Sequence, residues 1–239
     1  MKLTLTGGAW ITAGGRGLLS DGSKPLLAPG EPLLPRGKDL FDPPLARYGR
    51  FDRYTRLGCA AVALALRDAG LAETGRKRPI GIVSASRTEC LETDLAYYRT
   101  TLENGGAFAS PNLFCYTQPG IVLGECAVHF GLTGPTLCVG QPLTGSGLGA
   151  SALDTACRLL EAGQAETMLA GWIEAPPVAP DDWPQSERLV FPTGAIFVVL
   201  RPETDSAEPA QQALFRENGT LWKTTGDRRV PIQSLLDLF

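Results

Sequence analysis

The sequence lacks the cysteine pairs that hold structural zinc or cross-link a small disulfide-rich domain. Its six cysteines are scattered, and no two of them form a Cys-x-x-Cys pair. Scattered cysteines in apolar or helical contexts are typical of reduced, mostly buried thiols. We therefore expect no metal site, no disulfide framework and no cofactor, and free thiols at Cys59, Cys90, Cys115, Cys126, Cys138 and Cys157.

Long apolar runs and a strong charge of either sign are also missing. No stretch has the length and apolarity needed to span a bilayer. The N-terminal stretch MKLTLTGGAWITAGG alternates and turns at glycines, where a cleavable leader would have an apolar core. A formal net charge of −3 gives no general attraction for nucleic acid or an anionic membrane. These absences predict a cytoplasmic protein without a nucleic-acid or membrane partner.

What the sequence does contain is an alternation of short apolar runs and helical patterns. Apolar runs predict strands over residues 1–12, 79–85, 166–173 and 194–200. Helical spacing predicts helices over residues 53–70, 89–103 and 121–131, the second with Leu91, Leu95, Tyr98 and Leu102 in register. This alternation predicts an α/β domain with a mixed, mostly parallel sheet and helices packed on it.

Two segments do not follow the alternation. Residues 13–47 are rich in proline and glycine, which predicts an extended segment that wraps the surface or covers a partner. Residues 202–239 are weakly patterned, and their short apolar runs are compatible with a terminal strand and a small docking helix. The length favours one domain over residues 1–239, with its core at about 50–200.

The chain is organised around residues 136–163, TLCVGQPLTGSGLGASALDTACRLLEAG. Residues 136–139 suit a buried strand, a glycine-rich bend follows, and a helical pattern begins at Ala150 and ends before Gly163. This order is that of a nucleophile elbow, in which the glycines let the backbone come close to a ligand. The helix is expected to bury Leu153, Ala156, Cys157 and Leu160.

Ser146 stands where the nucleophile of such an elbow would be. Free N–H groups at a helix start favour an anion, and acyl-transfer enzymes place a Ser or Cys there. The alternative is that Ser146 is an ordinary helix-start residue in a glycine-rich turn.

Four stretches in this order resemble the N-terminal half of a β-ketoacyl synthase of the thiolase fold. They read FDRYTRLGCAAVALALRDAGL, GIVSASRTECLETDLAYYRTTLENGG, SPNLFCYTQPGIVLGECAVHFGLTGPT and RLLEAGQAETMLAGWIE. The first resembles the family's first core helix and the second its next strand and helix. The third resembles its dimer-side loop and helix, and the fourth the strand after the elbow. The match extends over roughly residues 50–200, and the first fifty residues match only loosely.

The elbow departs from the family pattern, which has a catalytic cysteine in a Thr-Ala-Cys run. Counting back from Gly163 places Ser146 at the cysteine position, whereas counting forward from Gly134 places that position near Leu143, so this bend is longer. Gln141 lies in the stretch where the two counts disagree. It is either a displaced form of the glutamine that chain-length-factor subunits carry in place of the cysteine, or a plain strand-end residue.

The resemblance also implies two catalytic histidines from a C-terminal half, and that this chain spans about half of a full-length member. Its one histidine, His129, falls where the family has a surface or structural residue. Without imidazoles, decarboxylation and nucleophile activation lose their proton-transfer and oxyanion partners. We therefore expect no catalytic residue, and an inert elbow position at Ser146 with Gly145, Thr144 and Gln141.

Three functions remain open. The first, which the departures favour, is a ketosynthase-like subunit, inactive alone, that pairs with a full ketosynthase and shapes its acyl pocket in fatty-acid, polyketide or aryl-polyene synthesis. The second is a minimal acyltransferase or hydrolase that uses Ser146. The third is a homodimeric scaffold that binds acyl carrier protein.

The resemblance implies which residues face the partner. In the family, the dimer brings the loop that matches residues 110–120 against the partner's pocket. Phe114, Cys115, Tyr116 and Gln118 are therefore expected to set the depth of that pocket, the alternative being ordinary loop packing. Half of such a sheet also leaves apolar surface that a partner would cover.

Overall fold

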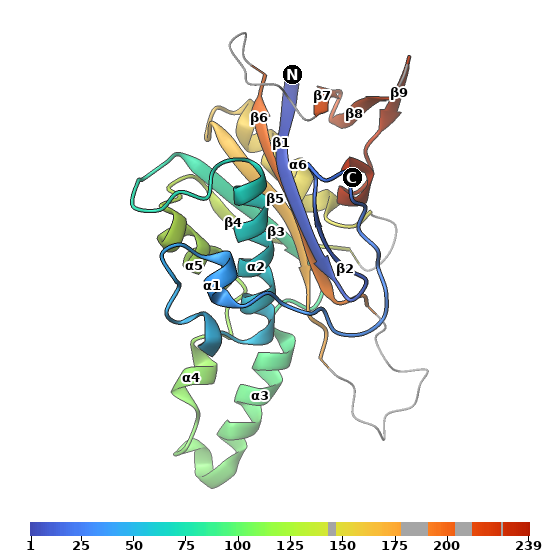
Figure 1. Cartoon of the computed structure of the whole chain (residues 1–239). Coiled ribbons are helices and arrows are strands. Elements are labelled where there is room, and N and C mark those ends of the chain that lie inside the picture. Colours follow the sequence, from blue (N-terminus) through green and yellow to red (C-terminus); the bar gives the residue numbers. More distant parts are fainter. Residues whose placement is uncertain (143–146, 178–190, 204–211, 226) are drawn as a thin grey trace.

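A mixed β-sheet with helices on both faces forms the core of the protein (Figure 1). The computed structural model describes residues 1–142, 147–177, 191–203, 212–225 and 227–239. The strand order is β4-β3-β5-β6-β1-β7-β8-β9, and β2 pairs with β1. Helices α2 and α5 cover one face, and α6 with the C-terminal turn η4 covers the other.

The described elements have the following bounds. The strands are β1 (Lys2–Thr12), β2 (Gly15–Leu18), β3 (Ile80–Ser86), β4 (Thr136–Gly140), β5 (Thr167–Glu174), β6 (Gly194–Pro202), β7 (Gln212–Glu217), β8 (Thr220–Thr225) and β9 (Arg228–Pro231). The α-helices are α1 (Gly37–Leu40), α2 (Arg53–Asp68), α3 (Leu91–Leu102), α4 (Pro111–Phe114), α5 (Ile121–Phe130) and α6 (Ala150–Glu161). The 3₁₀ turns are η1 (Tyr48–Arg50), η2 (Glu103–Gly106) and η4 (Leu235–Leu238). None of the described helices is long and apolar enough to cross a membrane.

The predicted α/β sheet is confirmed, but less of it is parallel than the sequence suggested. Among the described strands, parallel pairing is confined to β3 with its neighbours β4 and β5. The other pairings are antiparallel, because β1 runs opposite to both β6 and β7, and β7 to β9 form a meander. Short turns such as the one at Asn218 and Gly219, both with positive φ, can join only antiparallel strands.

A β-bulge in β1 lets one strand contribute to the core on both faces of the sheet. The register of β1 against β6 shifts between Leu5 and Gly7. Because side chains alternate with a period of two, this shift moves odd-numbered residues to the opposite face. Leu3 and Leu5 pack on the α6 side, whereas Ala9 and Ile11 pack on the side of α2.

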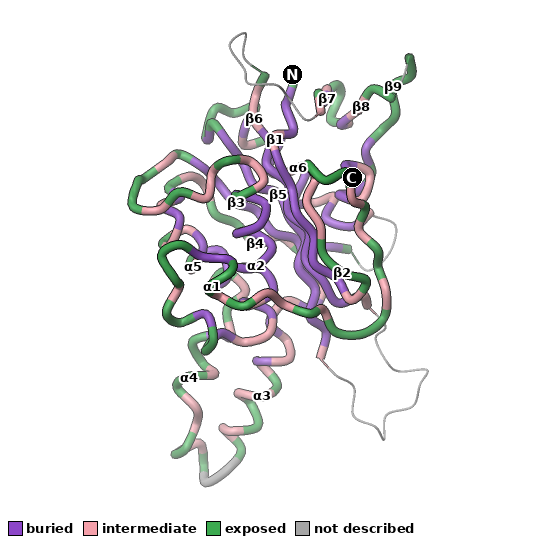
Figure 2. Tube along the Cα trace, in the orientation of Figure 1, coloured by how far each residue is buried: buried purple, intermediate pink, exposed green. Residues whose placement is uncertain are grey.

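Helix α2 is buried along almost its whole length, as its all-round apolar pattern predicts (Figure 2). Asp52 caps its N-terminus by accepting a hydrogen bond from the Thr55 N–H at 3.0 Å. Its last residue, Asp68, accepts one from the Gly8 N–H at 2.9 Å. These contacts fix α2 across the centre of the sheet.

Helices α3 and α4 extend away from the body as an arm, defined here as residues 91–114 (Figures 1 and 2). The sequence predicts α3 correctly, but its stripe of apolar residues does not pack on the core. Thr93 is the one buried residue of α3. The large apolar side chains that the arm exposes are Leu95, Tyr98, Leu102, Phe108 and Phe114.

The two segments with weak sequence patterns differ in how much regular secondary structure they contain. Residues 13–47 are largely irregular, as expected, apart from β2 and α1. The described part of residues 202–239 is more regular than expected, with three strands and the turn η4. Leu214, Leu221 and Leu235 place these strands and the turn in the core on the α6 side.

Candidate functional site

The bend between β4 and α6 is held by the side chain of Gln141, which follows β4 directly and is buried. The Oε1 atom of Gln141 accepts a hydrogen bond from the Gly149 N–H at 2.7 Å. Its Nε2 atom donates to the Gly147 carbonyl at 3.3 Å. Gly149 is the N-cap residue of α6, with φ 69°. The Gln141 side chain thus accepts the hydrogen bond of a backbone N–H at the start of α6. A free N–H at this position would be available to bind an anion.

The residues that the sequence places at the centre of the elbow, Leu143, Thr144, Gly145 and Ser146, lie outside the described residues, so their roles stay predictions. The helix that follows is confirmed. Its four predicted core residues Leu153, Ala156, Cys157 and Leu160 are all buried.

The strand before the bend is not the buried strand that its apolar sequence suggested. Strand β4 lies at the edge of the sheet, and none of its residues is fully buried. Its one pairing among the described strands is with β3, and Leu137 is 39% exposed. An apolar run of strand length fits an interior and an edge strand equally well when read alone.

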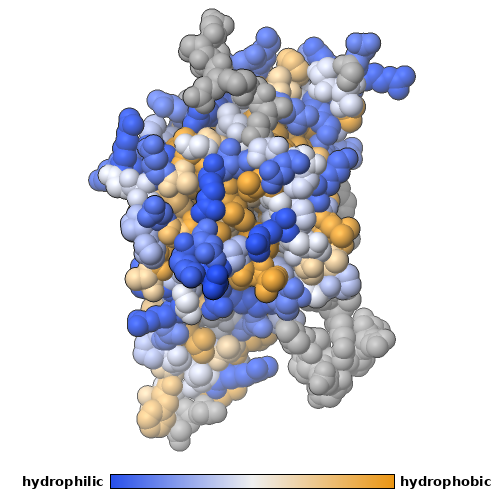
Figure 3. Space-filling model, in the orientation of Figure 1, coloured by the Kyte–Doolittle hydropathy of each residue, from blue (hydrophilic) through white to orange (hydrophobic). Residues whose placement is uncertain are grey.

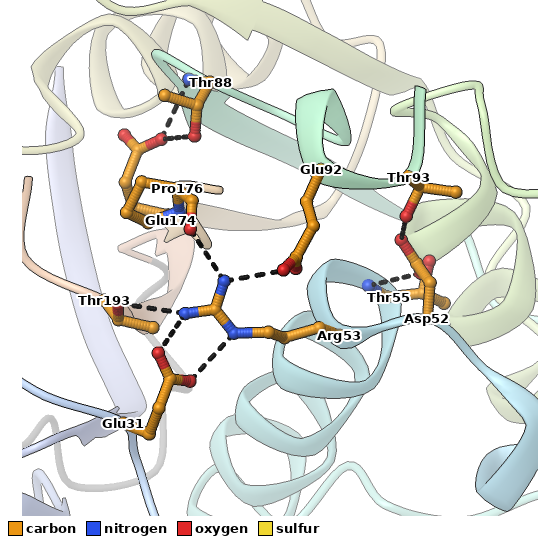
Figure 4. Close-up of polar contacts among 10 residues, drawn as sticks. All are labelled: Glu31, Asp52, Arg53, Thr55, Thr88, Glu92, Thr93, Glu174, Pro176 and Thr193. Atoms are coloured by element: carbon orange, nitrogen blue, oxygen red, sulfur yellow. Dashed lines mark hydrogen bonds and ion pairs between the residues drawn. The ribbon is translucent and has the colours of Figure 1, made fainter. Parts of the chain in front are cut away.

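Glu174, the last residue of β5, carries a fully buried carboxylate (Figure 4). The carboxylate accepts hydrogen bonds from the N–H groups of Arg87 at 3.1 Å and Thr88 at 2.8 Å. It also accepts from the hydroxyls of Thr88 and Ser86. These donors satisfy the buried charge and hold the loop between β3 and α3 against the end of β5.

Arg53, the first residue of α2, joins four separate parts of the chain (Figure 4). Its guanidinium forms ion pairs with Glu31 in the proline-rich segment and with Glu92 in α3, the latter at 3.3 Å. It also donates to the Pro176 carbonyl at 2.8 Å and to the Thr193 hydroxyl at 3.2 Å. Arg53 therefore fixes the base of the arm relative to the ends of β5 and β6.

Glu89, in the loop between β3 and α3, is held in an unfavourable state. Its φ is +49°, in the left-handed region that few residues other than glycine adopt. Burial raises the pKa of its carboxyl, and the nearby carboxylates of Asp94 and Glu174 raise it further. The folded state therefore binds this proton more tightly than the unfolded chain, so the contribution of Glu89 to stability falls as the pH rises.

The variant Glu89→Gln is expected to be more stable than the parent protein at pH 7 and equally stable near pH 4. Near pH 4 the carboxyl is mostly protonated in the folded chain and more than half protonated in the unfolded chain, so removing its charge changes little. Urea unfolding at the two pH values measures the difference. Glu92→Gln, which weakens the ion pair with Arg53, is the control and should lose stability at pH 7. An equal gain for Glu89→Gln at both pH values would contradict this account.

The four residues predicted to face a partner do not share one environment. Phe114 is 57% exposed at the end of the arm, and Cys115 and Gln118 are exposed beside it. Tyr116 is buried, with its ring centroid 6.0 Å from that of Phe51, so it packs on the protein's own core. The structure therefore presents Phe114, Cys115 and Gln118 on the surface, and Tyr116 supports them from inside.

His129 lies at the far end of the sheet from the bend. Its ring packs edge-on against two phenylalanine rings, and burial lowers its pKa. The Arg78 N–H donates to the Gly131 carbonyl, which places the end of α5 beside the start of β3. The Gln141 N–H donates to the Ser86 carbonyl, which places the bend beside the end of β3. The length of β3 thus separates the imidazole from the bend.

The cysteines are free thiols, as the sequence predicts. Four are buried, Cys138 is half-buried and Cys115 is exposed. Within the described ranges, no group of three or more His, Cys, Asp and Glu side chains is arranged to hold a metal ion.

The sequence singled out neither Glu174 nor Arg53. A signal for Glu174 was present, since it is the charged residue that ends the apolar run TMLAGWIE. A charge at the end of a buried strand needs nearby donors, so such a position is worth examining in any sequence. Arg53 gives no comparable signal, because its partners are remote in the chain.

Comparison with known proteins agrees with this fold. The model of the β-ketoacyl synthase N-terminal domain matches residues 36–178. A 3-oxoacyl-[acyl-carrier-protein] synthase 2 of Staphylococcus aureus is 26% identical over 128 residues, which cover 53% of this chain and 31% of that enzyme. The chain thus spans about a third of the length of the curated relatives it matches.

Solved structures give the same result. The ishigamide ketosynthase/chain length factor superposes with a TM-score of 0.63 at 20% identity, over 90% of this chain and 66% of that one. A ketosynthase in complex with its chain length factor from Xenorhabdus doucetiae gives 0.59 at 17% identity, over 86% and 81%. The family model covers more than half of the sequence, and the chain therefore belongs to the β-ketoacyl synthase family, whose thiolase-like N-terminal fold it shares.

Proposed function

We propose that this chain is a ketosynthase-like subunit that does not condense acyl groups itself but pairs with a full-length ketosynthase and shapes its acyl pocket. The observation that carries this proposal is the contrast between the two edges of the sheet. Strand β4 presents the uncharged sequence TLCVG, whereas β9 at the opposite edge presents RRVP.

Charged residues and proline on an edge strand prevent pairing with another chain. Strand β9 carries Arg228, Arg229 and Pro231 and is exposed throughout. Strand β4 has no such protection, and its exposed Leu137 adds apolar surface. An unprotected, uncharged edge fits a strand that pairs with a partner strand.

The arm supplies a second apolar surface (Figure 3). Its exposed side chains Tyr98, Leu102, Phe108 and Phe114 are each more than half exposed. Large apolar groups gathered in one region are typical of protein interfaces. In the family the loop that matches residues 110–120 meets the partner's pocket, and we infer that Phe114 lines that pocket with its apolar neighbours on the arm beside it.

Two relatives support pairing with a ketosynthase. Both the ishigamide and the Xenorhabdus doucetiae proteins are ketosynthases with a chain length factor. The chain matched in the second complex is covered to 81%, so its length is similar to that of this chain. A chain-length-factor role in fatty-acid, polyketide or aryl-polyene synthesis therefore accounts for the fold and the size of the match together.

The bend supports the absence of catalysis by this chain alone. No cysteine stands there, and the Gln141 amide takes up the Gly149 N–H. The one histidine is at the other end of β3. A serine needs a base to act as a nucleophile, and the sequence has a single histidine, so we do not favour the acyltransferase alternative that uses Ser146.

Co-expression tests the proposal. The tagged chain is expressed with each full-length ketosynthase of its source organism, and the purified material is examined by sedimentation. We expect a one-to-one heterodimer with one of them, and a change in the length of the acyl product that this ketosynthase releases. A purified chain that extends an acyl thioester alone, or one that never co-purifies with a ketosynthase, would refute the proposal.

A homodimer that binds acyl carrier protein is the second candidate. Arg47 and Arg50 line a hollow of about 300 Å³ beside α4 and α5, and two guanidinium groups favour an acidic partner surface. Glu125 neutralises Arg47 in part, at 3.1 Å. Sedimentation of the chain alone, with and without acyl carrier protein, separates this candidate from the first.

A further inference from the structure

A small hollow lies between α3 and α4, the two helices of the arm (Figure 1). It has a volume of about 210 Å³ and is lined by Tyr97, Ala109, Ser110, Pro111 and Phe114. The rings of Tyr97 and Phe114 pack on each other, with their centroids 5.4 Å apart. The arm therefore carries a hollow whose walls are aromatic and small residues.

The size of the hollow suits a single side chain better than a free ligand. Small-molecule sites usually enclose about 300 to 1,000 Å³. A cavity of about 150 Å³ is enough to hold one benzene ring. The hollow is therefore large enough for one aromatic ring and smaller than most ligand sites.

The walls of the hollow favour an uncharged occupant. None of the described residues that line it is charged. The Ser110 hydroxyl already accepts a hydrogen bond from the Leu113 N–H at 3.3 Å, and the Ser110 N–H donates to the Thr100 hydroxyl at 3.1 Å. Aromatic rings gain energy from offset or edge-on contact with other rings, so Tyr97 and Phe114 favour an aromatic group.

The hollow has a defined shape before a partner binds. Ser110 caps α4, Pro111 is the first residue of that helix, and the Ala109 N–H donates to the Gly106 carbonyl at 3.1 Å. Proline at the first helical position fixes the backbone in the conformation that the helix needs. A preorganised hollow loses little conformational entropy when a side chain enters it.

Strand β4 alone is too small to hold a partner chain. It has five residues, whereas specific protein interfaces take about 20 to 30 residues from each chain. Neighbouring elements expose further apolar side chains, at Val128 on α5, which contacts β4, and at Phe114 on the arm. A chain that pairs with β4 therefore needs additional contacts, and the arm offers them.

We propose that the hollow between α3 and α4 receives one aromatic side chain of the partner ketosynthase, which anchors the arm in the heterodimer. This inference rests on the proposed pairing with a ketosynthase and names the contact that holds the arm. A single large side chain buried in a pocket commonly supplies much of the binding energy of an interface. The anchor is a contact between the two proteins, so it does not depend on the acyl group that the ketosynthase carries.

Filling the hollow is the first test. In the variant Ala109→Trp, an indole attached to the wall competes with the partner's side chain, and binding of the ketosynthase should weaken about 30-fold. The matched control is Ala107→Trp, two residues earlier in the same loop, where the parent residue is exposed and lies outside the hollow. Both variants should keep the helix content of the parent chain. Equal binding by Ala109→Trp and the parent would overturn the inference, and so would equal losses in the two variants.

Thiol labelling is the second test, and it decides if Ala109→Trp does not fold. Added ketosynthase should slow the modification of Ala109→Cys by N-ethylmaleimide about tenfold or more, and that of Ala107→Cys by less than about twofold. An unchanged rate for Ala109→Cys would overturn the inference. So would equal protection by a high concentration of the chain alone or by acyl carrier protein, since another occupant would then fill the hollow. If the parent chain binds no ketosynthase, the proposed function fails with this inference, whereas binding that leaves the hollow open refutes the inference alone.

Discussion

Replacing Glu174 with glutamine is expected to lower the free energy of unfolding by about 3 kcal/mol. The carboxylate accepts hydrogen bonds from the Arg87 and Thr88 N–H groups and from two hydroxyls. An amide keeps one acceptor oxygen and turns an NH₂ group toward donors, so at least one buried N–H loses its partner. Urea unfolding at pH 7 measures the loss.

The control for this variant is a glutamate at the opposite end of β5. Glu166 is exposed just before β5, and Glu166→Gln should change stability by less than about 0.5 kcal/mol. Similar losses for the two variants would mean that the buried carboxylate is not what holds the loop after β3. A loss confined to Glu174→Gln, with the helix content of the protein retained, would support the assignment.

Replacing Leu137 with lysine is expected to weaken the complex with a ketosynthase by about 100-fold, or roughly 2.7 kcal/mol. If β4 pairs with a partner strand, the lysine ammonium would be taken from water into the interface without a partner. Because Leu137 is 39% exposed in the free chain, the substitution should leave the fold intact. Titration of the purified ketosynthase with each variant measures the dissociation constant.

Val230→Lys is a closely matched control, because Val230 is 38% exposed and lies on β9 at the other edge of the sheet. It should bind the ketosynthase as the parent chain does, since β9 already carries arginines. If both lysine variants bind normally, β4 is not the pairing edge. If both bind weakly, the added positive charge weakens binding wherever it is placed, and the result does not identify β4 as the pairing edge.

The sequence alone predicts the elements whose burial is uniform. Helix α2 and strands β3, β5 and β6 carry apolar residues on every side, and each lies inside the domain as expected. Helix α6 is predicted equally well, because its buried residues recur at helical spacing. These patterns are local, so a single sequence contains the needed information.

Positions that depend on the neighbouring element are predicted less well. The apolar runs of β4 and β5 look alike, yet one strand is at the edge and the other is inside. The apolar spacing of α3 suggests a core helix, whereas α3 extends outward on the arm. Burial here is decided by what else the fold brings near, which periodicity cannot report.

In the candidate site, too, the sequence predicts local features and misses those that depend on remote residues. The sequence identifies the bend and marks Gln141 as unusual, but the two hydrogen bonds that give this side chain a role join it to residues beyond the turn. The contact of Leu235 with Gly149 is more remote still and has no local signature. Recognising it requires knowing where the last strands lie.

Strand β1 sits in the middle of the sheet, between β6 and β7, and Leu3 pairs with Pro202 on one side and with Leu214 on the other. Apart from its last residues, which pair with the neighbouring β2, β1 has its edges covered only once β6 and β7 have paired with it, and both strands are remote from it in the chain. Until then its apolar residues are available to other chains. Slow folding is therefore expected from this arrangement, whatever the finished protein binds.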